Sequence, residues 1–164
     1  MTLVETGLVL ETGAVLRLGD DAVSVLGELV GALGDPDTDS GYFENAFCFS
    51  PQARFLRWAQ LEVVVSQDAD GVATFTQWYV DGASDPAGLV TIDGLGVGAP
   101  VGFLQANYGT ALDLVSALED TYVGLFAATN PGSGGTLLGL TSSLDPDAEI
   151  LEIWAGDECT RVFT

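Results

Sequence analysis

The side chains that usually carry chemistry are few in this chain of 164 residues, and most of them are carboxylates. The chain has 24 aspartates and glutamates, four arginines, no lysine and no histidine, so its formal net charge is −20. Without histidine it can form no Ser-His-Asp triad, no Cys-His pair and no histidine-rich zinc site. Without lysine it can form neither a Schiff base nor a Walker-type phosphate site. Carboxylates and two cysteines are left as the candidates for chemistry.

The carboxylates do not assemble into a recognisable catalytic or metal-binding motif. The run Asp35-Pro-Asp-Thr-Asp39 supplies oxygens at the first, third and fifth positions of an EF-hand loop, but Ser40 stands where glycine is needed and Ala46 where glutamate is needed. Paired carboxylates can hydrolyse glycosides, yet no pair lies in an active-site setting, and the Gly-x-Ser-x-Gly elbow is absent. We therefore expect no enzymatic activity, no metal site and no cofactor.

The charge balance also limits the partners. Four arginines cannot form a basic stripe against a charge of −20, which excludes nucleic acid and disfavours anionic membrane surfaces. No run of 18 apolar residues occurs, so we expect no membrane insertion. The acid excess has three interpretations: adaptation to salt, solubility of a secreted protein, or binding of a basic partner or calcium.

Cys48 and Cys159 have two interpretations that the residues alone leave open. In an oxidising compartment they would form one disulfide, which closes a long loop and stabilises the fold by about 4–5 kcal/mol at most. In a reducing compartment they would be two buried thiols. The chain has no Cys-x-x-Cys metal or redox motif.

Apolar periodicity predicts two helices. Hydrophobic residues make up 48% of the chain and its mean hydropathy is +0.35, which is enough for a core. A helix is expected from about 21 to 33, capped by Asp20 or Asp21 and ended by Gly34. A shorter helix is expected from about 100 to 107, with Pro100 in its first turn.

The remaining apolar runs predict antiparallel strands. Residues 54–66 and 72–80 form an expected hairpin around the turn 67–71. In the second half, strands are expected at 121–129, 135–142 and 149–155. A helix followed by antiparallel strands, twice over, predicts an α+β fold of two tandem helix-plus-antiparallel-sheet units, with the helices on one sheet face.

Two stretches about 80 residues apart align with each other. Aligning Gly19 with Gly98 places a short apolar strand, a glycine turn, a helix and a closing glycine at matching positions in both. We therefore expect two repeats, at 1–82 and 88–164.

The two aligned stretches resemble a known family. A Leu-Gly turn at Leu18-Gly19, an Ala-Val-x-x-Leu helix and a Leu-Gly-x-Pro stop in the first stretch, and Thr91–Gly98 leading into Leu104-x-x-x-Tyr-Gly109 in the second, resemble the SmpA/OmlA, or BamE-like, family. A tandem pair of such units is similar to the β-lactamase inhibitory protein architecture and to uncharacterised actinobacterial exported proteins. The resemblance implies a Cys48–Cys159 disulfide and an extracellular or cell-envelope location. Residues 1–10 have no cation and do not form a signal peptide as they stand.

Alternation along the strands suggests a binding surface. Leu61, Val63 and Val65 share one face with Phe55, so Trp58 is expected on the opposite, open face of the sheet. The last strand repeats this pattern, with Trp154 on the open side. For the strand at 72–80, the alternation does not decide which face is outward.

Aromatic residues among polar ones on an open sheet face are typical of protein-binding surfaces. The expected anchors and polar contacts are Trp58, Gln60, Gln77, Tyr79, Glu152 and Trp154. The alternative is that the three tryptophans pack as core.

We therefore expect a secreted or cell-envelope, non-enzymatic protein-binding module that uses its open sheet face, with an unknown protein as partner. The alternatives are a structural envelope protein without a ligand face and an acidic ion-binding or salt-adapted module.

Overall fold

The computed structural model describes residues 1–82, 89–116 and 123–160, and within them the chain forms mainly β-strands. The strands are β1 (Thr2–Val4), β2 (Gly7–Val9), β3 (Val15–Arg17), β4 (Thr38–Asp39), β5 (Gln52–Trp58), β6 (Leu61–Gln67), β7 (Ala73–Asp81), β8 (Val90–Thr91), β9 (Leu112–Ser116), β10 (Gly124–Thr129), β11 (Thr136–Thr141) and β12 (Ile150–Ala155). The helices are α1 (Ala22–Leu33) and α2 (Val101–Tyr108), and the 3-10 turn η1 (Gly109–Ala111) follows α2.

Eight strands form one continuous antiparallel sheet in the order β4-β5-β6-β7-β12-β11-β10-β9. The first four strands come from the first half of the chain and the last four from the second half. They meet where β7 pairs with β12, with Val80 opposite Ile153. The remaining strands form a small sheet in the order β3-β2-β1-β8, in which β1 and β8 run parallel.

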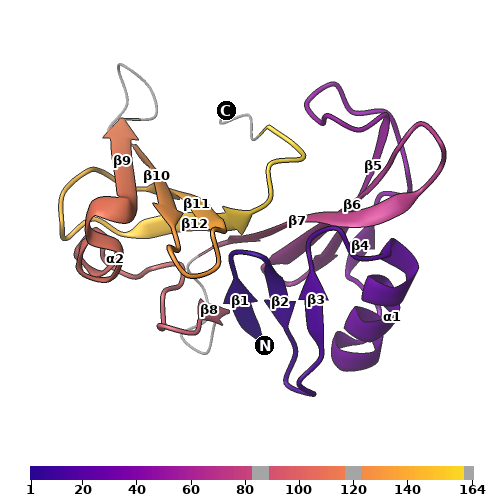
Figure 1. Cartoon of the computed structure of the whole chain (residues 1–164), viewed down its shortest axis with the longest axis horizontal. Helices are drawn as coiled ribbons and strands as arrows, with labels where there is room; N and C mark the ends of the chain where they lie inside the picture. The colour runs from indigo at the N-terminus through magenta and orange to yellow at the C-terminus, as the bar shows by residue number, and fades with distance from the viewer. Residues whose placement is uncertain (83–88, 117–122, 161–164) are drawn as a thin grey trace.

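A second layer covers one face of the large sheet. It consists of α1, the small sheet and α2 in a row (Figure 1). The core lies between the two layers, and its largest fully buried side chains include Trp78, Phe75 and Phe126. Trp78 also joins the layers, because its Nε1 donates a hydrogen bond to the carbonyl of Val4 at 3.0 Å.

The expected α+β fold of two tandem helix-plus-sheet units is wrong. The described residues contain twelve strands in two sheets and only two short helices, and strands from both halves of the chain join edge to edge. The prediction failed because β1, β2, β3 and β8 have only two or three residues each. Such short strands show no alternation, so the sequence predicted a short strand before Gly19 but not the small sheet to which it belongs.

Both helices were predicted correctly. Asp21 caps α1, because its carboxylate accepts a hydrogen bond from the backbone N–H of Ser24 at 2.9 Å. This hydrogen bond lowers the pKa of Asp21. Gly34 ends the helix with a φ of 83°, a conformation that glycine adopts without strain. α2 begins after Pro100.

The strand expected at 54–66 is in fact two strands, β5 and β6, joined by the turn at Ala59 and Gln60. Ala59 has a φ of 50°, which only glycine, asparagine or aspartate adopt readily. Tertiary contacts hold it there: its N–H donates to Asp37 at 2.7 Å and its carbonyl accepts from Arg57 Nε at 2.9 Å. The hairpin expected around 67–71 is confirmed as β6 and β7.

Within the described parts of the chain, neither helix has the length and apolar character needed to cross a membrane. The proposed boundaries at 1–82 and 88–164 stay a prediction, and residues 83–88 between them lie outside the described residues.

Candidate functional site: the outer face of the large sheet

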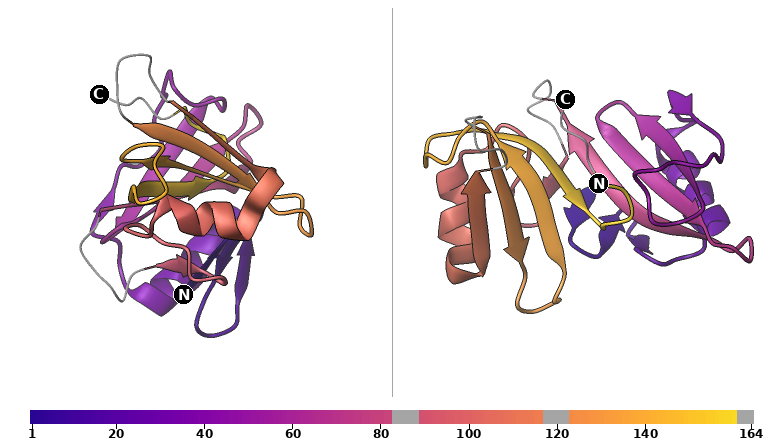
Figure 2. Two further views of the ribbon diagram at one scale, coloured as in Figure 1. Left: turned by 90° about the vertical axis from the view of Figure 1, so that its left-hand side faces the viewer. Right: turned by 90° about the horizontal axis from the view of Figure 1, so that it is seen from above.

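The face of the large sheet that points away from α1, the small sheet and α2 is here called the outer face. It lies toward the viewer in the right-hand view of Figure 2. Cross-strand partners share a face, so the register defines which side chains form it. One row crosses all eight strands and consists of Thr38, Arg57, Glu62, Tyr79, Trp154, Leu138, Ala127 and Asp113.

The two halves of this face differ in chemistry. The outward side chains of β5 to β7 include three charged ones: Arg57 forms ion pairs with Asp81 and, at 3.8 Å, with Glu62. On β9 to β11 most of them are aliphatic, and the exposed carboxylate of Asp113 lies at the edge, opposite Ala127. This aliphatic surface comprises Val115, Leu125, Leu138 and Leu140.

Two aromatic residues mark the boundary between the halves. The rings of Tyr79 and Trp154 lie 6.2 Å apart at a tilt of 40°, and each side chain is 6% exposed. They pack with Leu140 and with the half-buried Leu125 and Leu138. The pair therefore forms the base of the outer surface rather than projecting from it.

Trp58 lies on the other face. It is 7% exposed, packs in the main core and donates from Nε1 to the carbonyl of Gly34 at 2.9 Å. The predicted alternation misplaced it, because that alternation was counted straight through the turn at Ala59. In the hairpin Trp58 is opposite Leu61, so the two side chains share the core face.

The other predicted site residues occupy three different settings. Gln77 is fully buried on the outer side of β7, and its Oε1 accepts from the N–H of Cys159 at 3.1 Å. Its Nε2 has no hydrogen-bond partner among the described residues. Glu152 is half-buried on the outer face between Asp81 and Leu140, and Gln60 is a half-buried turn residue. The structure thus brings Tyr79, Trp154 and Glu152 together and separates them from Trp58.

Cys48 and Cys159 form a disulfide, as the family resemblance implied. The bridge packs on Ala53 and Val64, on the outer side of β5 and β6. It is compatible with an extracellular or envelope location, because disulfides persist in oxidising compartments.

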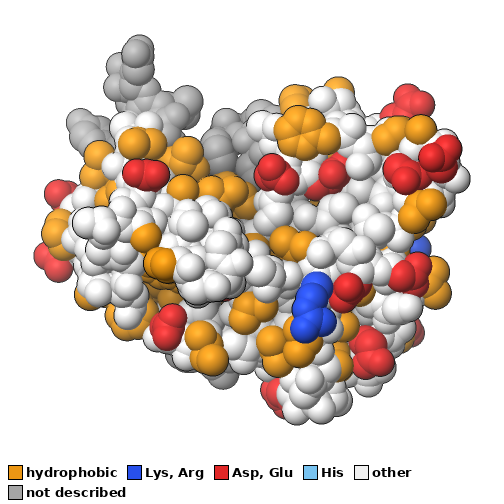
Figure 3. Space-filling view, viewed as in Figure 1, with side chains coloured by type: hydrophobic (Ala, Val, Ile, Leu, Met, Phe, Trp, Pro, Cys, Tyr) orange, Lys and Arg blue, Asp and Glu red, His pale blue; other side chains and the backbone are white. Residues whose placement is uncertain are grey.

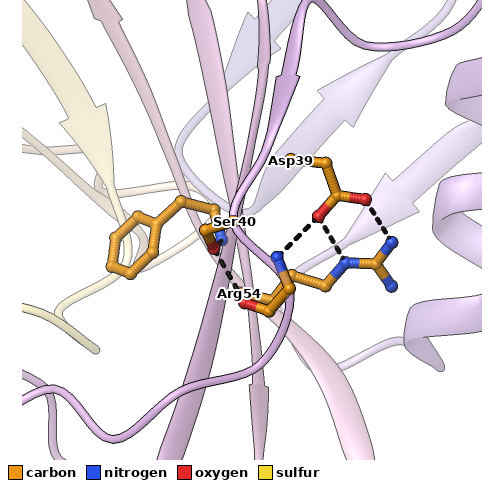
Figure 4. A network of polar contacts seen from close by, with 5 residues as sticks. Asp39, Ser40 and Arg54 are labelled. Carbon is orange, nitrogen blue, oxygen red and sulfur yellow. Dashed lines mark hydrogen bonds and ion pairs between the residues drawn. The ribbon is translucent and has the colours of Figure 1, made fainter.

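The disulfide fastens the connection between β4 and β5, residues 41–50, which is here called the clamped loop. Besides the disulfide, hydrogen bonds at the base of this loop restrain it, and Figure 4 shows these hydrogen bonds. Asp39 accepts from Arg54 Nε at 2.8 Å, from Arg54 Nη2 at 2.6 Å and from the N–H of Gly41 at 3.0 Å. Ser40 Oγ accepts from the N–H of Phe55 at 2.9 Å and donates to the carbonyl of Gly41 at 2.8 Å.

These contacts also determine the charge of Asp39. Hydrogen bonds and charge attraction from Arg54, with the N–H of Gly41, lower the pKa of Asp39 from 3.8 to about 2. The carboxylate therefore stays ionised, and the pair stays formed, far into the acid range.

The clamped loop exposes three phenylalanines. Phe43 is 41% exposed, Phe47 56% and Phe49 78%. Figure 3 shows hydrophobic side chains gathered over the upper right of the molecule with acidic side chains beside them. Sequence reasoning did not include these residues, although three phenylalanines around a cysteine in a segment without strand alternation were a visible signal.

The comparisons with known proteins found no matching family model, no similar curated protein and no similar solved structure. The resemblance to the BamE-like family therefore stays a prediction.

Proposed function

We propose that this chain is an extracellular or cell-envelope protein-binding module, and that a protein partner docks on the aliphatic half of the outer face. The observation that carries the proposal is the pattern of β10 and β11. A sheet with one face in water alternates apolar and polar residues, whereas a sheet covered on both sides is apolar on both. β10 and β11 are apolar on both sides, although α1, α2 and the small sheet lie on one side only.

The alternation on these strands supports this directly. Phe126 and Leu137 point into the core, while their neighbours Leu125 and Leu138 point outward and remain half-buried. Val115, on the edge strand β9, is 54% exposed. By contrast, β5 to β7 carry Arg57, Glu62 and Asp81 outward, as a solvated face does. An apolar surface next to aromatic residues is the kind of surface on which protein partners bury most binding energy.

The test uses two charge-matched variants at opposite edges of the large sheet. Val115→Asp places a charge in the aliphatic surface, and Thr38→Asp adds the same charge at the exposed edge strand β4. The tagged wild-type chain recovers a partner from extracellular and envelope fractions of the source organism, and calorimetry then measures the affinity of each variant for that purified partner. We expect Val115→Asp to weaken binding by about 2 kcal/mol or more and Thr38→Asp to leave it unchanged. Equal affinities for both variants would refute the proposed surface.

A further inference from the structure

The clamped loop carries a second apolar surface, separate from the aliphatic surface on β9 to β11. Its centre is Phe47 and Phe49, on either side of Cys48. Residues 47–49 run antiparallel to the segment around Cys159, with the N–H of Phe49 donating to the carbonyl of Glu158 at 2.9 Å and the N–H of Thr160 donating to the carbonyl of Phe47 at 2.7 Å. Side chains alternate in such a ribbon, so Cys48 faces the sheet while both rings face solvent.

The loop is held in this conformation before any partner arrives. The N–H of Phe47 donates to Asn45 Oδ1 at 3.0 Å, that of Cys48 to the carbonyl of Asn45 at 3.1 Å, and that of Ser50 to Glu158 Oε1 at 2.6 Å. The disulfide adds a covalent restraint. A loop that is already ordered loses little conformational entropy when it binds, so its exposed rings can contribute most of their burial energy to affinity.

Phe43, earlier in the same loop, is less exposed than Phe47 and Phe49. Its backbone pairs with Ala53, and its ring lies 5.7 Å from that of Phe55. The ring of Phe43 thus rests on β5 through Phe55, whereas Phe49, at 78% exposed, is the most exposed phenylalanine of the loop.

The charges around these rings determine which partner fits. Glu44 and Asp157 are exposed near the loop in sequence and along the paired segment, and Glu158 is half-buried there. The arginine at the base of the loop, Arg54, is already paired with Asp39 and lies over the ring of Tyr42. The whole chain carries −20. An apolar centre within a negative field complements an apolar pocket that is flanked by lysine or arginine.

The same charges argue against two other occupants. A second copy of this chain would bring two surfaces of equal negative charge together, which repel each other. A bilayer that contains anionic lipid would be repelled in the same way.

We propose that the clamped loop inserts Phe47 and Phe49 into an apolar pocket of a cationic protein, with the carboxylates around the loop meeting the basic rim. The inference shares with the proposed function only the premise that the partner is a protein. It concerns a different part of the surface and names the charge of the partner.

The probe is a displayed random-peptide library selected against the immobilised full chain, followed by titration of the best synthetic peptide. We expect the selected sequences to combine lysine or arginine with apolar residues. We also expect affinity to fall as salt is raised, because rim charges are screened. Selection of acidic or uncharged peptides, or binding that does not respond to salt, would overturn the proposal.

The variants locate the site. The double substitution Phe47→Ser with Phe49→Ser should weaken peptide binding at least about tenfold, since truncated hot-spot aromatics cost that much or more. The matched control is Val23→Ser on α1, where the valine is 79% exposed and lies on the other side of the large sheet. Equal affinity of the double variant and the control contradicts the proposal.

Two further variants separate this inference from its neighbours. Cys48→Ser with Cys159→Ser retains every phenylalanine but releases the loop, so binding should weaken severalfold if pre-organisation matters. Loss of binding in Val115→Asp but not in the phenylalanine variant would refute the loop and support the aliphatic surface; the opposite result would support the loop and leave the aliphatic surface to its own test.

The other occupants have their own readouts. Sedimentation of phosphatidylcholine vesicles with the full chain tests a lipid surface, and analytical ultracentrifugation tests self-association. If either is strong and requires Phe47 and Phe49 while no cationic peptide binds, the cationic protein partner is wrong.

Discussion

The two halves of the outer face are built from strands of the same sheet, but they differ in the side chains that they present to solvent. On β5 to β7 the outward positions hold the ion pairs of Arg57, and the disulfide covers Ala53 and Val64. On β9 to β11 they hold Val115, Leu125 and Leu138, with Leu140 beside them and the charge of Asp113 confined to the edge strand. On β5 to β7 the disulfide of the chain itself covers apolar side chains of the outer face. On β9 to β11 the aliphatic surface has no such cover among the described residues, and we propose that a partner protein buries it.

This contrast shows why burial alone is a poor guide to function here. Trp58 and Trp154 have nearly the same exposure, 7% and 6%, yet they lie on opposite faces of the sheet. Trp58 is packed between two layers, while Trp154 is packed against neighbours on one surface. The following predictions test the contrast, from the largest expected effect to the smallest.

Alanine substitution of the two tryptophans should separate the two faces. Trp58→Ala should reduce the free energy of unfolding by about 3–5 kcal/mol, because it empties a core position and leaves the carbonyl of Gly34 without its donor. Trp154→Ala should cost about 1–3 kcal/mol, since only one surface loses its packing. Chemical denaturation measures both values, and a Trp154 variant that is as unstable as the Trp58 variant would make the outer face a second core.

Removing the disulfide tests the half of the outer face that lies on β5 to β7. Replacing both Cys48 and Cys159 by serine should reduce stability by about 2–5 kcal/mol, because the bridge spans 111 residues and restrains the unfolded chain. Denaturation with and without reductant provides the measurement. The wild-type chain should lose the same stability on reduction, and the variant should not respond to reductant at all.

Acid titration tests the base of the clamped loop. The pKa of Asp39 is lower in the folded chain than its ordinary value of 3.8, so the stabilisation by Arg54 is present above pH 3.8 and is lost as the pH falls through about 2. The effect should be about 1 kcal/mol or less, since both side chains are partly exposed. Asp39→Asn should be less stable than wild type at neutral pH, and the difference should shrink as the pH falls through about 2, whereas a difference as large at pH 2 as at neutral pH would assign the effect to packing.

The smallest expected effect on stability concerns the aliphatic surface on β9 to β11. Val115→Thr should change stability by no more than about 0.5 kcal/mol, because the side chain is 54% exposed on an edge strand. It should nevertheless reduce the binding of a hydrophobic dye that fluoresces on apolar surfaces, while Thr38→Ser on β4 should not. Equal dye fluorescence in both variants would show that the aliphatic surface is not accessible.

Local signals in the sequence predicted part of the fold and little of the site. The cap at Asp21 and the stop at Gly34 located α1, because capping depends on residues within one turn of the helix end. The turn around Asp68 located the hairpin of β6 and β7. The turn at Ala59 was not predicted, because its backbone conformation is stabilised by contacts with Asp37 and Arg57 and not by its own residue type.

The sequence by itself determined the local elements and a few specific exclusions: a chain with no lysine and no histidine can form no Ser-His-Asp triad, no lysine Schiff base and no Walker-type phosphate site, wherever its residues lie. Only the tertiary structure decided which tryptophan faces the core, because a register is set by pairing between strands and a turn that is missed by one position reverses every face after it. It also decided that the strands of both halves form one sheet, and that Phe47 and Phe49 project from it. Edge-to-edge pairing and the exposure of a loop depend on residues far apart in the chain, which no local pattern records.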